Sequence, residues 1–563
     1  MTSINFRTSS HRTVKLKNHP MDRRHFLSAS SLTGIASILR KKKKKKGKTA
    51  PPSPPPPNRV QVAAGVLDEV SVPELQSRQR QKLITAERLT EIYLARIEAI
   101  DRSGPALHSV IEVNPDALAI ARALDAEFKT KGARTPLHGM PVLIKDNIDT
   151  GDKMQTTAGS LALAGNPAAN DSWVAARLRA AGAVILGKTN LSEWANFRST
   201  HSTSGWSGRG GQTKNPYVLD RNPCGSSSGT GAAIAASLAA VGVGSETDGS
   251  VVCPSSMCGI VGIKPTLGLI SRAGIIPIAH SQDTAGPMAR TVWEAALLLG
   301  VLTGVDPNDP ATQASDGKAF PDYTRFCDPT GLRGARLGIA RQYFNIGPAV
   351  TALMEQSIAL MKQAGAIIVD PVNFSTYEGW RDTETTVLLY EFKADLNTYL
   401  AHRGASVKSL ADCIAFNQAN RSTEMPYFEQ ELMQQAQAKG PLTDKAYLDA
   451  LAHNLKLSRT EGIDAILSKD NLDAIVAPTA GPAWLTDWVD GDHADSGCSS
   501  PPAVAGYPHI TVPAGFQFGL PLGISFFGAP WTEPKLIKIA YAFEQAGKAR
   551  RKPEFLTTVT YHA

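Results

Sequence analysis

The sequence NPCGSSSGTG at residues 222–231 holds three consecutive serines in a glycine-rich segment. Its central part matches the G-x-S-x-G pattern, in which a serine hydrolase presents a nucleophile that would here be Ser227. That pattern needs an apolar strand directly before it, whereas two turn-forming pairs, Asn215-Pro216 and Asn222-Pro223, precede it in this chain. The sequence therefore disfavours Ser227 as the nucleophile and favours a loop built for another purpose.

A second serine-containing turn, SETDGS, follows at residues 245–250 and ends in Ser250. The segment between the two turns is rich in Ala, Gly and Val, which predicts a tightly packed helix leading into a strand. Gly249 permits a tight turn whose backbone N–H groups would point at an oxyanion beside Ser250. We expect the two turns to present hydroxyl and N–H groups to one place.

Lys145 supplies the third group that serine chemistry needs, because a serine hydroxyl attacks a carbonyl carbon only when a base takes its proton. It ends the apolar run PVLI in GMPVLIKDNI, so we expect its ammonium group to be partly desolvated. Burial lowers the pKa of a lysine and makes the neutral amine available as a base near neutral pH. The alternative interpretation of Lys145 is a salt bridge to Asp146 or to another carboxylate.

Taken together, these three segments resemble the amidase signature family of serine hydrolases, and the spacing of Ser226 and Ser250 is similar to that of the family's two catalytic serines. The resemblance covers roughly residues 70–550, and two C-terminal segments, 472–483 and 501–528, are also similar to the family. It implies a large single domain of the α/β class, with a central mixed β-sheet covered by helices on both faces. The alternation of predicted helices and strands along the chain agrees with such a layered architecture.

The resemblance also implies a role for each candidate residue. Ser250 would attack the amide carbonyl, and Ser226, held by a cis peptide bond in the family, would relay the proton to Lys145. Ser227 would be a supporting hydrogen-bonding residue. The backbone N–H groups expected to form the oxyanion hole are those of Thr247, Asp248, Gly249 and Ser250.

The sequence departs from the common family pattern around the expected nucleophile. Asp248 occupies a position that is often Gly, and Val252 occupies one that is often Arg. An anionic side chain at position 248 would oppose catalysis unless it pointed away from the oxyanion hole. The variant sequence ETDGSVVCPSS most resembles the branch of the family that contains bacterial peptide amidases.

Resemblance to that branch implies hydrolysis of the C-terminal amide of peptides to the free acid and ammonia, with no cofactor and no metal ion. Three alternatives stay open: an amidase for other acyl, aryl or fatty amides, a tRNA-dependent amidotransferase subunit, and a catalytically silent binding protein on the same scaffold. We expect a monomer that binds a small peptide amide. An acidic segment at residues 487–497 lacks EF-hand spacing and is interpreted as a solvated loop.

Hydrophobic periodicity predicts the elements that position these residues. The chain shows no Pro-, Ser- or Gly-rich linker across the body of the sequence, which favours one large domain at residues 66–555. The predicted helices lie at residues 85–104 and 115–132 and at the starts of 171–190 and 232–245. The predicted strands lie at residues 106–113 and 139–148 and at the ends of 171–190 and 232–245.

The N-terminal residues are predicted to contain an export signal and to lie outside the folded domain. An Arg pair before a mildly apolar run predicts a twin-arginine signal at residues 21–40. Residues 1–20 precede a natural start at Met21 and are interpreted as an upstream extension, and residues 41–65 as a basic, polyproline linker. We therefore expect a periplasmic or extracellular protein, and no later segment is apolar enough to span a membrane.

Positive charge is concentrated at the N-terminus. Residues 1–60 hold 15 of the 59 Lys and Arg and one of the 51 Asp and Glu, so the rest of the chain has a net charge of −6. A mildly acidic body disfavours a nucleic-acid partner, which needs a basic surface. The six cysteines form no C-x-x-C pair and no zinc spacing with His, so we expect buried free thiols.

Overall fold

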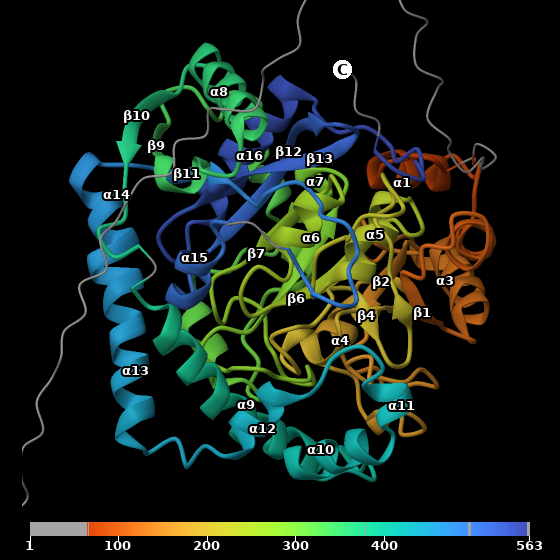
Figure 1. The fold of residues 1–563 in the computed structure, drawn as a ribbon. Helices are drawn as coiled ribbons and strands as arrows, with labels where there is room; N and C mark the ends of the chain where they lie inside the picture. Colours follow the sequence, from red (N-terminus) through yellow and green to blue (C-terminus); the bar gives the residue numbers. More distant parts are fainter. Residues whose placement is uncertain (1–64, 66, 378, 494–496, 560–563) are drawn as a thin grey trace, which may run out of the picture. The chain divides into compact units, whose positions relative to one another are not determined.

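The computed structural model describes residue 65 and residues 67–377, 379–493 and 497–559, so the predicted extension, export signal and most of the linker lie outside the described residues. A sheet of 11 strands runs through the described chain in the order β1-β3-β2-β6-β8-β7-β12-β13-β11-β9-β10 (Figure 1). Its strands are β1 (Val110–Val113), β2 (Pro141–Lys145), β3 (Val184–Thr189), β6 (Val241–Glu246), β7 (Val261–Lys264), β8 (Thr284–Ala289), β9 (Arg336–Ala340), β10 (Ile367–Val372), β11 (Ala474–Pro478), β12 (His509–Gln517) and β13 (Leu520–Phe527). A separate two-stranded sheet pairs β4 (Trp206–Ser207) with β5 (Gly211–Gln212).

The large sheet is mixed. Strand β2 runs parallel to β3 and β6, whereas β8 is antiparallel to both β6 and β7, and β12 is antiparallel to β7 and β13. The carboxyl ends of β2 and β6 therefore meet at the same edge of the sheet, where Lys145 and the turn after Glu246 lie. The predicted α/β class with a central mixed sheet is confirmed.

Helices cover both faces of the sheet. One layer consists of α5 and α6, which pack on β2, β6, β7 and β8, and the other includes α4, α7, α8 and α16, which contact one another. The helices are α1 (Val72–Arg80), α2 (Ala86–Arg96), α3 (Ala117–Lys131), α4 (Trp173–Ala180), α5 (Ser228–Ala235), α6 (Val252–Met257), α7 (Val292–Leu302), α8 (Pro348–Gln363), α9 (Arg381–Arg403), α10 (Leu410–Ala419), α11 (Arg421–Glu424), α12 (Glu431–Gln437), α13 (Lys445–Leu455), α14 (Asp464–Asp470), α15 (Ser500–Ala505) and α16 (Glu533–Gly547).

Glycines in β6 allow α5 to approach the sheet closely. A Cβ atom at Gly242 would lie 2.7 Å from Cγ2 of Thr230, and one at Gly244 would lie 2.7 Å from Oγ of Ser227. Every residue of α5 is buried. The helix begins at Ser228, earlier than the predicted start at residue 232, because the serine loop already turns into the helix.

Two predicted elements near the N-terminus have different bounds from those expected. The helix predicted at residues 85–104 is α2 followed by a π-helical segment, Ile97–Arg102. The strand predicted at residues 106–113 is reduced to β1, because Ala106 and His108 have positive φ angles of 51° and 53° that interrupt an extended chain.

The helices from α9 to α12 form a cluster over the loops that follow β2, β3 and β7, and Figure 1 shows these helices gathered on one side of the sheet. Buried side chains of α9, α10 and α12 pack against Leu191, Trp194, Ile276 and Ile278 of those loops. This part of the chain, in which no motif was recognised, therefore covers the edge at which the candidate residues lie.

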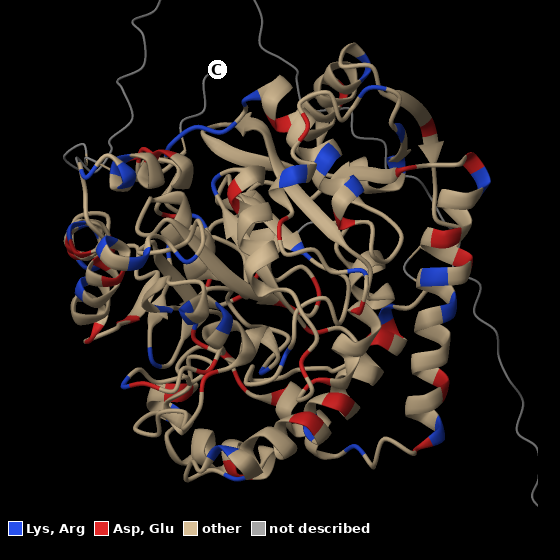
Figure 2. Ribbon diagram, turned by 180° about the vertical axis from the view of Figure 1, so that it is seen from behind, with Lys and Arg blue, Asp and Glu red and all other residues tan. Residues whose placement is uncertain are grey.

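Charged side chains of both signs alternate along the elements. Figure 2 shows Lys and Arg interspersed with Asp and Glu, for example along α13 and the helical segment after it, where Lys445 pairs with Asp449 and Lys456 with Glu461. Among the described residues, every helix is too short or too polar to cross a membrane.

Candidate active site

Lys145 is the last residue of β2, whose five residues are all buried between β3 and β6. Its relative exposure is 0%, which is more complete burial than the sequence predicted. Burial lowers the pKa of Lys145 to about 7, while the Asp283 and Glu246 carboxylates act in the opposite direction. The neutral amine, which is the form that accepts a proton, is therefore well populated near neutral pH.

Three contacts surround Nζ of Lys145. Nζ lies 2.8 Å from Oγ of Ser226, 2.9 Å from Oγ of Ser245 and 3.2 Å from the carbonyl oxygen of Ser245. A neutral amine has two N–H donors and one lone pair, which matches two hydrogen bonds to Ser245 and one accepted from the Ser226 hydroxyl. Asn147 Nδ2 donates to the same Ser245 Oγ at 2.9 Å and so fixes that hydroxyl.

Asp146 does not act as the partner of Lys145. Its Oδ1 lies 3.3 Å from Nη1 of Arg209, and its Oδ2 accepts from the backbone N–H groups of Thr157 and Gly159, both at 3.3 Å. No ion pair joins Lys145 to a carboxylate within the described part of the chain. The alternative of a salt-bridged lysine is therefore not supported.

Ser226 is fully buried in the loop before α5, and the peptide bond between Gly225 and Ser226 is cis. Its carbonyl oxygen accepts a hydrogen bond from the backbone N–H of Ser192 at 3.1 Å. A Cβ atom at position 225 would lie 2.2 Å from Oγ of Ser192, so this close approach requires glycine. The loop thus directs Oγ of Ser226 at Lys145.

Ser227 fastens the start of α5 to β6. Its Oγ donates to the carbonyl oxygen of Ser245 at 3.0 Å and accepts from the Ser245 N–H at 3.2 Å. Its backbone N–H donates to the carbonyl oxygen of Ser250 at 3.1 Å, which brings the two serine turns together. No strand directly precedes Ser227 in the described chain, since the nearest one before it, β5, ends at Gln212.

Ser250 lies in the turn between β6 and α6, where Gly249 has a φ angle of +78°, in keeping with the tight turn that the sequence predicted. The turn is held by Glu246, whose Oε2 accepts from the N–H groups of Val251 at 2.7 Å and Val252 at 3.0 Å. Ser250 is 8% exposed, the highest exposure of the three candidate catalytic residues. The turn therefore holds Ser250 rigidly while leaving it the most accessible of the three.

Thr247, the first residue of the turn, is held by the loop before β8. Its Oγ1 donates to Oδ1 of Asp283 at 2.6 Å, and its carbonyl oxygen accepts from Nε2 of Gln282 at 3.3 Å. Burial raises the pKa of Asp283 to about 6. The backbone of the turn, from which the oxyanion-hole N–H groups are expected, is thus anchored at both ends.

Asp248 is engaged by side chains from outside the turn. Its Oδ2 accepts a hydrogen bond from Oγ of Ser500 at 2.6 Å. Burial, followed by the neighbouring Asp248 charge, raises the pKa of Glu384 well above its ordinary value, which favours the neutral carboxyl that could donate to Asp248. The sequence offered no sign of this pair, because Glu384 lies on α9, far along the chain from the turn.

The expectation of free thiols is wrong for two of the six cysteines. A disulfide joins Cys224 to Cys253, and it could form because the two serine turns lie side by side in the fold. Among the described residues, Cys258, Cys327, Cys413 and Cys498 are free.

A cavity of about 320 Å³ lies next to the residues that hold Lys145. Ser245, Asn147 and Thr247 line it, together with Asp283. Neither Oδ1 of Asn147 nor Oγ1 of Thr284, which also lines the cavity, has a hydrogen-bond partner in the described structure. Ser245 and Asn147 were missed at the sequence level, since nothing in their local sequence distinguishes them from ordinary strand and turn residues.

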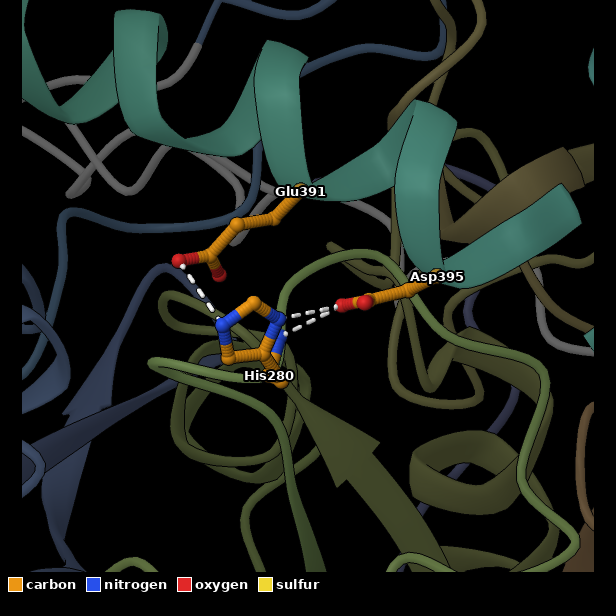
Figure 3. Close-up of side chains that lie close together, drawn as sticks. All are labelled: His280, Glu391 and Asp395. Carbon is orange, nitrogen blue, oxygen red and sulfur yellow. Dashed lines mark hydrogen bonds and ion pairs between the residues drawn. The ribbon is translucent and has the colours of Figure 1, made fainter. Parts of the chain in front are cut away.

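His280, Glu391 and Asp395 form a cluster, as Figure 3 shows, and His280 and Asp395 also line the same cavity. His280 Nδ1 lies 2.8 Å from Oδ2 of Asp395, and Nε2 lies 3.4 Å from Oε1 of Glu391. Glu391 also accepts hydrogen bonds from Ser281 and from the hydroxyl of Tyr447, both at 2.8 Å. These side chains already have partners within the protein, so the cluster joins the loop before β8 to α9.

Of the acidic segment at residues 487–497, which was expected to be a solvated loop, the structure describes residues 487–493 and 497. Asp492 is half-buried and accepts hydrogen bonds from the N–H of Ser204 at 2.8 Å and from its Oγ at 2.5 Å. Asp492 therefore packs against the loop before β4 instead of being solvated, whereas Asp490 and His493 are exposed as expected.

Comparison with known proteins finds similar sequences and folds. Residues 88–537 match the Amidase family. A probable amidase of Arabidopsis thaliana is 44% identical over 500 residues, which cover 87% of this chain and 92% of the relative. A crystal structure of native peptide amidase from Stenotrophomonas maltophilia is 50% identical with a TM-score of 0.83, covering 87% of this chain and 99% of that one.

The structure of the peptide amidase PAM with the competitive inhibitor chymostatin is 51% identical to this protein. It covers 86% of this chain and 99% of its own, with a TM-score of 0.85. The resemblance found in the sequence is confirmed by both the family match and the shared fold. The chain therefore belongs to the amidase signature family.

Proposed function

We propose that this protein hydrolyses the C-terminal amide of peptides to the free acid and ammonia, with Ser250 as nucleophile, Ser226 as proton relay and Lys145 as general base. The 2.8 Å contact between Nζ of Lys145 and Oγ of Ser226 carries the proposal, because it pairs a fully buried amine with a hydroxyl. Similarity to PAM, at 51% identity, supports peptide amides as the substrate class.

In the first half-reaction, the Ser250 oxygen bonds to the amide carbonyl carbon while its proton passes to Ser226 and the Ser226 proton passes to Lys145. The negative charge on the carbonyl oxygen is stabilised by backbone N–H groups of the turn at residues 247–250. The C–N bond then breaks, and ammonia leaves with the proton that Lys145 returns through Ser226. The products are an acyl ester on Ser250 and ammonia.

In the second half-reaction, a water oxygen bonds to the ester carbonyl carbon and gives its proton along the same path. The bond between the carbonyl carbon and the Ser250 oxygen breaks, and that oxygen recovers a proton from Ser226. The free acid is released, and Lys145 ends the cycle as the neutral amine with which it began. Each proton that Lys145 accepts is therefore returned within the same half-reaction.

Asp248 is compatible with this mechanism because of its two partners. The hydrogen bond from Ser500 stabilises the Asp248 carboxylate, and the raised pKa of Glu384 favours a neutral neighbour rather than a second negative charge. The departure from the common family sequence at this position is therefore accompanied by compensating groups, which favours an active enzyme over a silent binding protein.

Ammonia release tests the proposal directly. Purified protein is incubated with a dipeptide amide, the corresponding free acid, a fatty acyl amide and glutamine, and the same assay is run with Ser250→Ala. The proposal expects ammonia from the dipeptide amide and none with Ser250→Ala. Faster ammonia release from the fatty amide or from glutamine would show that peptide amides are not the preferred substrates. Absence of ammonia release from every amide would instead indicate a binding protein.

We propose that the protein is exported through its twin-arginine segment. The disulfide between Cys224 and Cys253 supports this, because structural disulfides persist mainly in oxidising compartments. Cell fractionation of the full chain tests it, with Arg23→Lys/Arg24→Lys as the matched variant. Export of the wild type and retention of the variant are expected; equal export of both would contradict the assignment of the signal.

A further inference from the structure

Three buried ionisable side chains project from one face of the sheet. Gly242 of β6 and Gly262 of β7 both pair with Met288 of β8, and side chains two residues apart on a strand share a face. Glu246 and Lys264 therefore lie on the same face, on either side of β8. Lys145 lies on this face too, because its neighbour two residues earlier in β2 pairs with Gly242.

This face is the one covered by α5 and α6. A Cβ atom at Gly262 would lie 2.3 Å from Oγ of Ser255 in α6 and 3.1 Å from Cγ1 of Val251. Glu246 and Lys264 thus point from the sheet toward the turn that holds Ser250. Both side chains are essentially unexposed, at 1% and 0%.

Glu246 bonds the chain directly after the nucleophile. One carboxylate oxygen, Oε2, takes the N–H groups of both Val251 and Val252. The other, Oε1, has no hydrogen-bond partner in the described structure. A buried carboxylate in this state needs a nearby positive charge to remain ionised.

Lys264 lies on the same face as Glu246, across strand β8, and is the cation that most counteracts the burial of the Glu246 carboxylate. Its Nζ donates to the carbonyl oxygen of Pro265 at 3.1 Å, which leaves further N–H groups available. Burial lowers the pKa of Lys264 to about 8, whereas Glu246, Glu533 and Asp248 counteract that effect. Burial raises the pKa of Glu246, and Lys264 is the largest influence in the opposite direction.

His509 is a further titratable neighbour of Lys264, because the two residues pair across strands β12 and β7. Burial and then the Lys264 charge lower the pKa of His509 to about 3, so the imidazole is neutral at working pH. Lys264 therefore carries the positive charge on this side of the turn. Val252, at the position where arginine is common in the family, provides none.

We propose that Lys264 and Glu246 form one buried charge pair that fixes the turn of Ser250, so that both act as positioning residues for the nucleophile. The proposal rests on the proposed function in taking Ser250 as the nucleophile. Lys264 lies on β7, the strand that follows α6. The proposal is that this lysine provides the positive charge that Val252 does not.

Four proteins test the pair: wild type, Lys264→Met, Glu246→Gln and the double variant. Lys264→Met leaves Glu246 buried without its counter-charge, and we expect kcat for the dipeptide amide to fall about 100-fold with KM within about twofold. Glu246→Gln keeps an acceptor for Val251 and Val252 and is expected to cost about tenfold. The kcat of the double variant should be no lower than that of Lys264→Met. If the two substitutions acted independently, their losses in kcat would multiply to about 1,000-fold, and that result would overturn the proposal.

The pH profile separates positioning from a general loss of packing. In Lys264→Met the carboxyl of Glu246 protonates more readily, so its kcat should fall on the acidic side at a higher pH than in the wild type. The double variant should lack this added dependence, because glutamine does not titrate. An identical acid limb in Lys264→Met and the double variant would contradict the pair.

Lys188→Met is the matched control, since Lys188 is also a fully buried strand lysine. Its Nζ donates to the carbonyl oxygen of Ile148 and to Thr156 rather than facing Glu246. When Lys188→Met is combined with Glu246→Gln, the losses in kcat of the two substitutions should multiply.

Thermal unfolding of the same proteins keeps this test separate from the proposed function. Non-additive unfolding temperatures for Lys264→Met and Glu246→Gln support the pair even if no amide is hydrolysed, and additive ones overturn it. If the wild type hydrolyses the amide but the losses in kcat of Lys264→Met and Glu246→Gln multiply in the double variant, the positioning role is overturned and the proposed function stands.

Discussion

Cys224 and Cys253 are joined by a disulfide that ties the loop of Ser226 to the turn of Ser250. The two cysteines are 29 residues apart, and closing such a loop stabilises the folded state by about 3–4 kcal/mol in the chain-entropy account. We predict that Cys224→Ala/Cys253→Ala lowers the unfolding temperature and also kcat, because the two turns lose a covalent link. Calorimetry and the ammonia assay measure both quantities.

Reduction of the wild type should reproduce the effect of that double variant, and the same reductant should leave the variant itself unchanged. Cys327→Ala removes a free, half-buried thiol and serves as the control for loss of a cysteine. Full activity and an unchanged unfolding temperature in the reduced wild type would show that the link is dispensable.

The low pKa of Lys145 predicts the acid limb of the pH profile. Because the neutral amine is the base, kcat/KM should rise with pH through about 7 and then level off. Lys145→Arg keeps a positive charge at every working pH and should lower kcat at least about 10³-fold, with no recovery at alkaline pH. A wild-type profile that is flat between pH 5 and about 9 would exclude Lys145 as the titrating base.

Ser227 and Ser250 allow a hydrogen-bonding serine to be compared with the proposed nucleophile. Ser227→Ala removes two hydrogen bonds to Ser245, worth about 1 kcal/mol each, and should lower kcat less than about tenfold. Ser250→Ala should cost at least about 10³-fold. Ser228→Ala, which removes one hydrogen bond to the carbonyl oxygen of Cys224, is the matched control. The reverse order, with Ser227→Ala inactive and Ser250→Ala active, would restore the nucleophile-elbow interpretation.

Glu384 is expected to work as a neutral acid beside Asp248. Glu384→Gln keeps both a donor toward Asp248 and an acceptor for Gln282, so kcat should stay within about threefold of the wild type. Glu384→Leu removes the donor and should lower kcat about tenfold or more, because Asp248 loses one of its two partners. If both variants lost activity equally, Glu384 would act as a carboxylate rather than as a protonated acid.

The sequence was sufficient to predict the parts of the site that depend on local pattern. An apolar run ending in Lys145 predicted a buried strand, and Gly249 predicted a tight turn before Ser250, because both properties follow from a few adjacent residues. The residues that were missed act across long sequence separations. Ser245 contacts Lys145 from another strand, and Cys224 meets Cys253 only because α5 folds onto β6.

The fold class was also predictable from the sequence, but the order of the strands was not. Alternating helices and strands predicted the α/β class, whereas the order of the 11 strands depends on pairings such as that of β12 with β7, which joins a segment near the C-terminus to one in the middle of the chain. Element ends also moved where single residues override periodicity, as Ala106 and His108 do before β1.

His280 predicts a pH-dependent part of the stability. The hydrogen bond to Asp395, and the Glu391 charge after it, raise the pKa of His280 against the opposing effect of burial (Figure 3). A raised folded-state pKa means that the contribution is fully present below the unfolded value of about 6.5 and is lost as pH rises through the folded value. Since the His280 side chain is 44% exposed, we expect only about 0.5 kcal/mol. His280→Gln should therefore lower the unfolding temperature more at pH 6 than at about pH 9. Asp395→Asn should reduce that difference, and an equal loss at both pH values would show that protonation of His280 does not stabilise the join between the loop and α9.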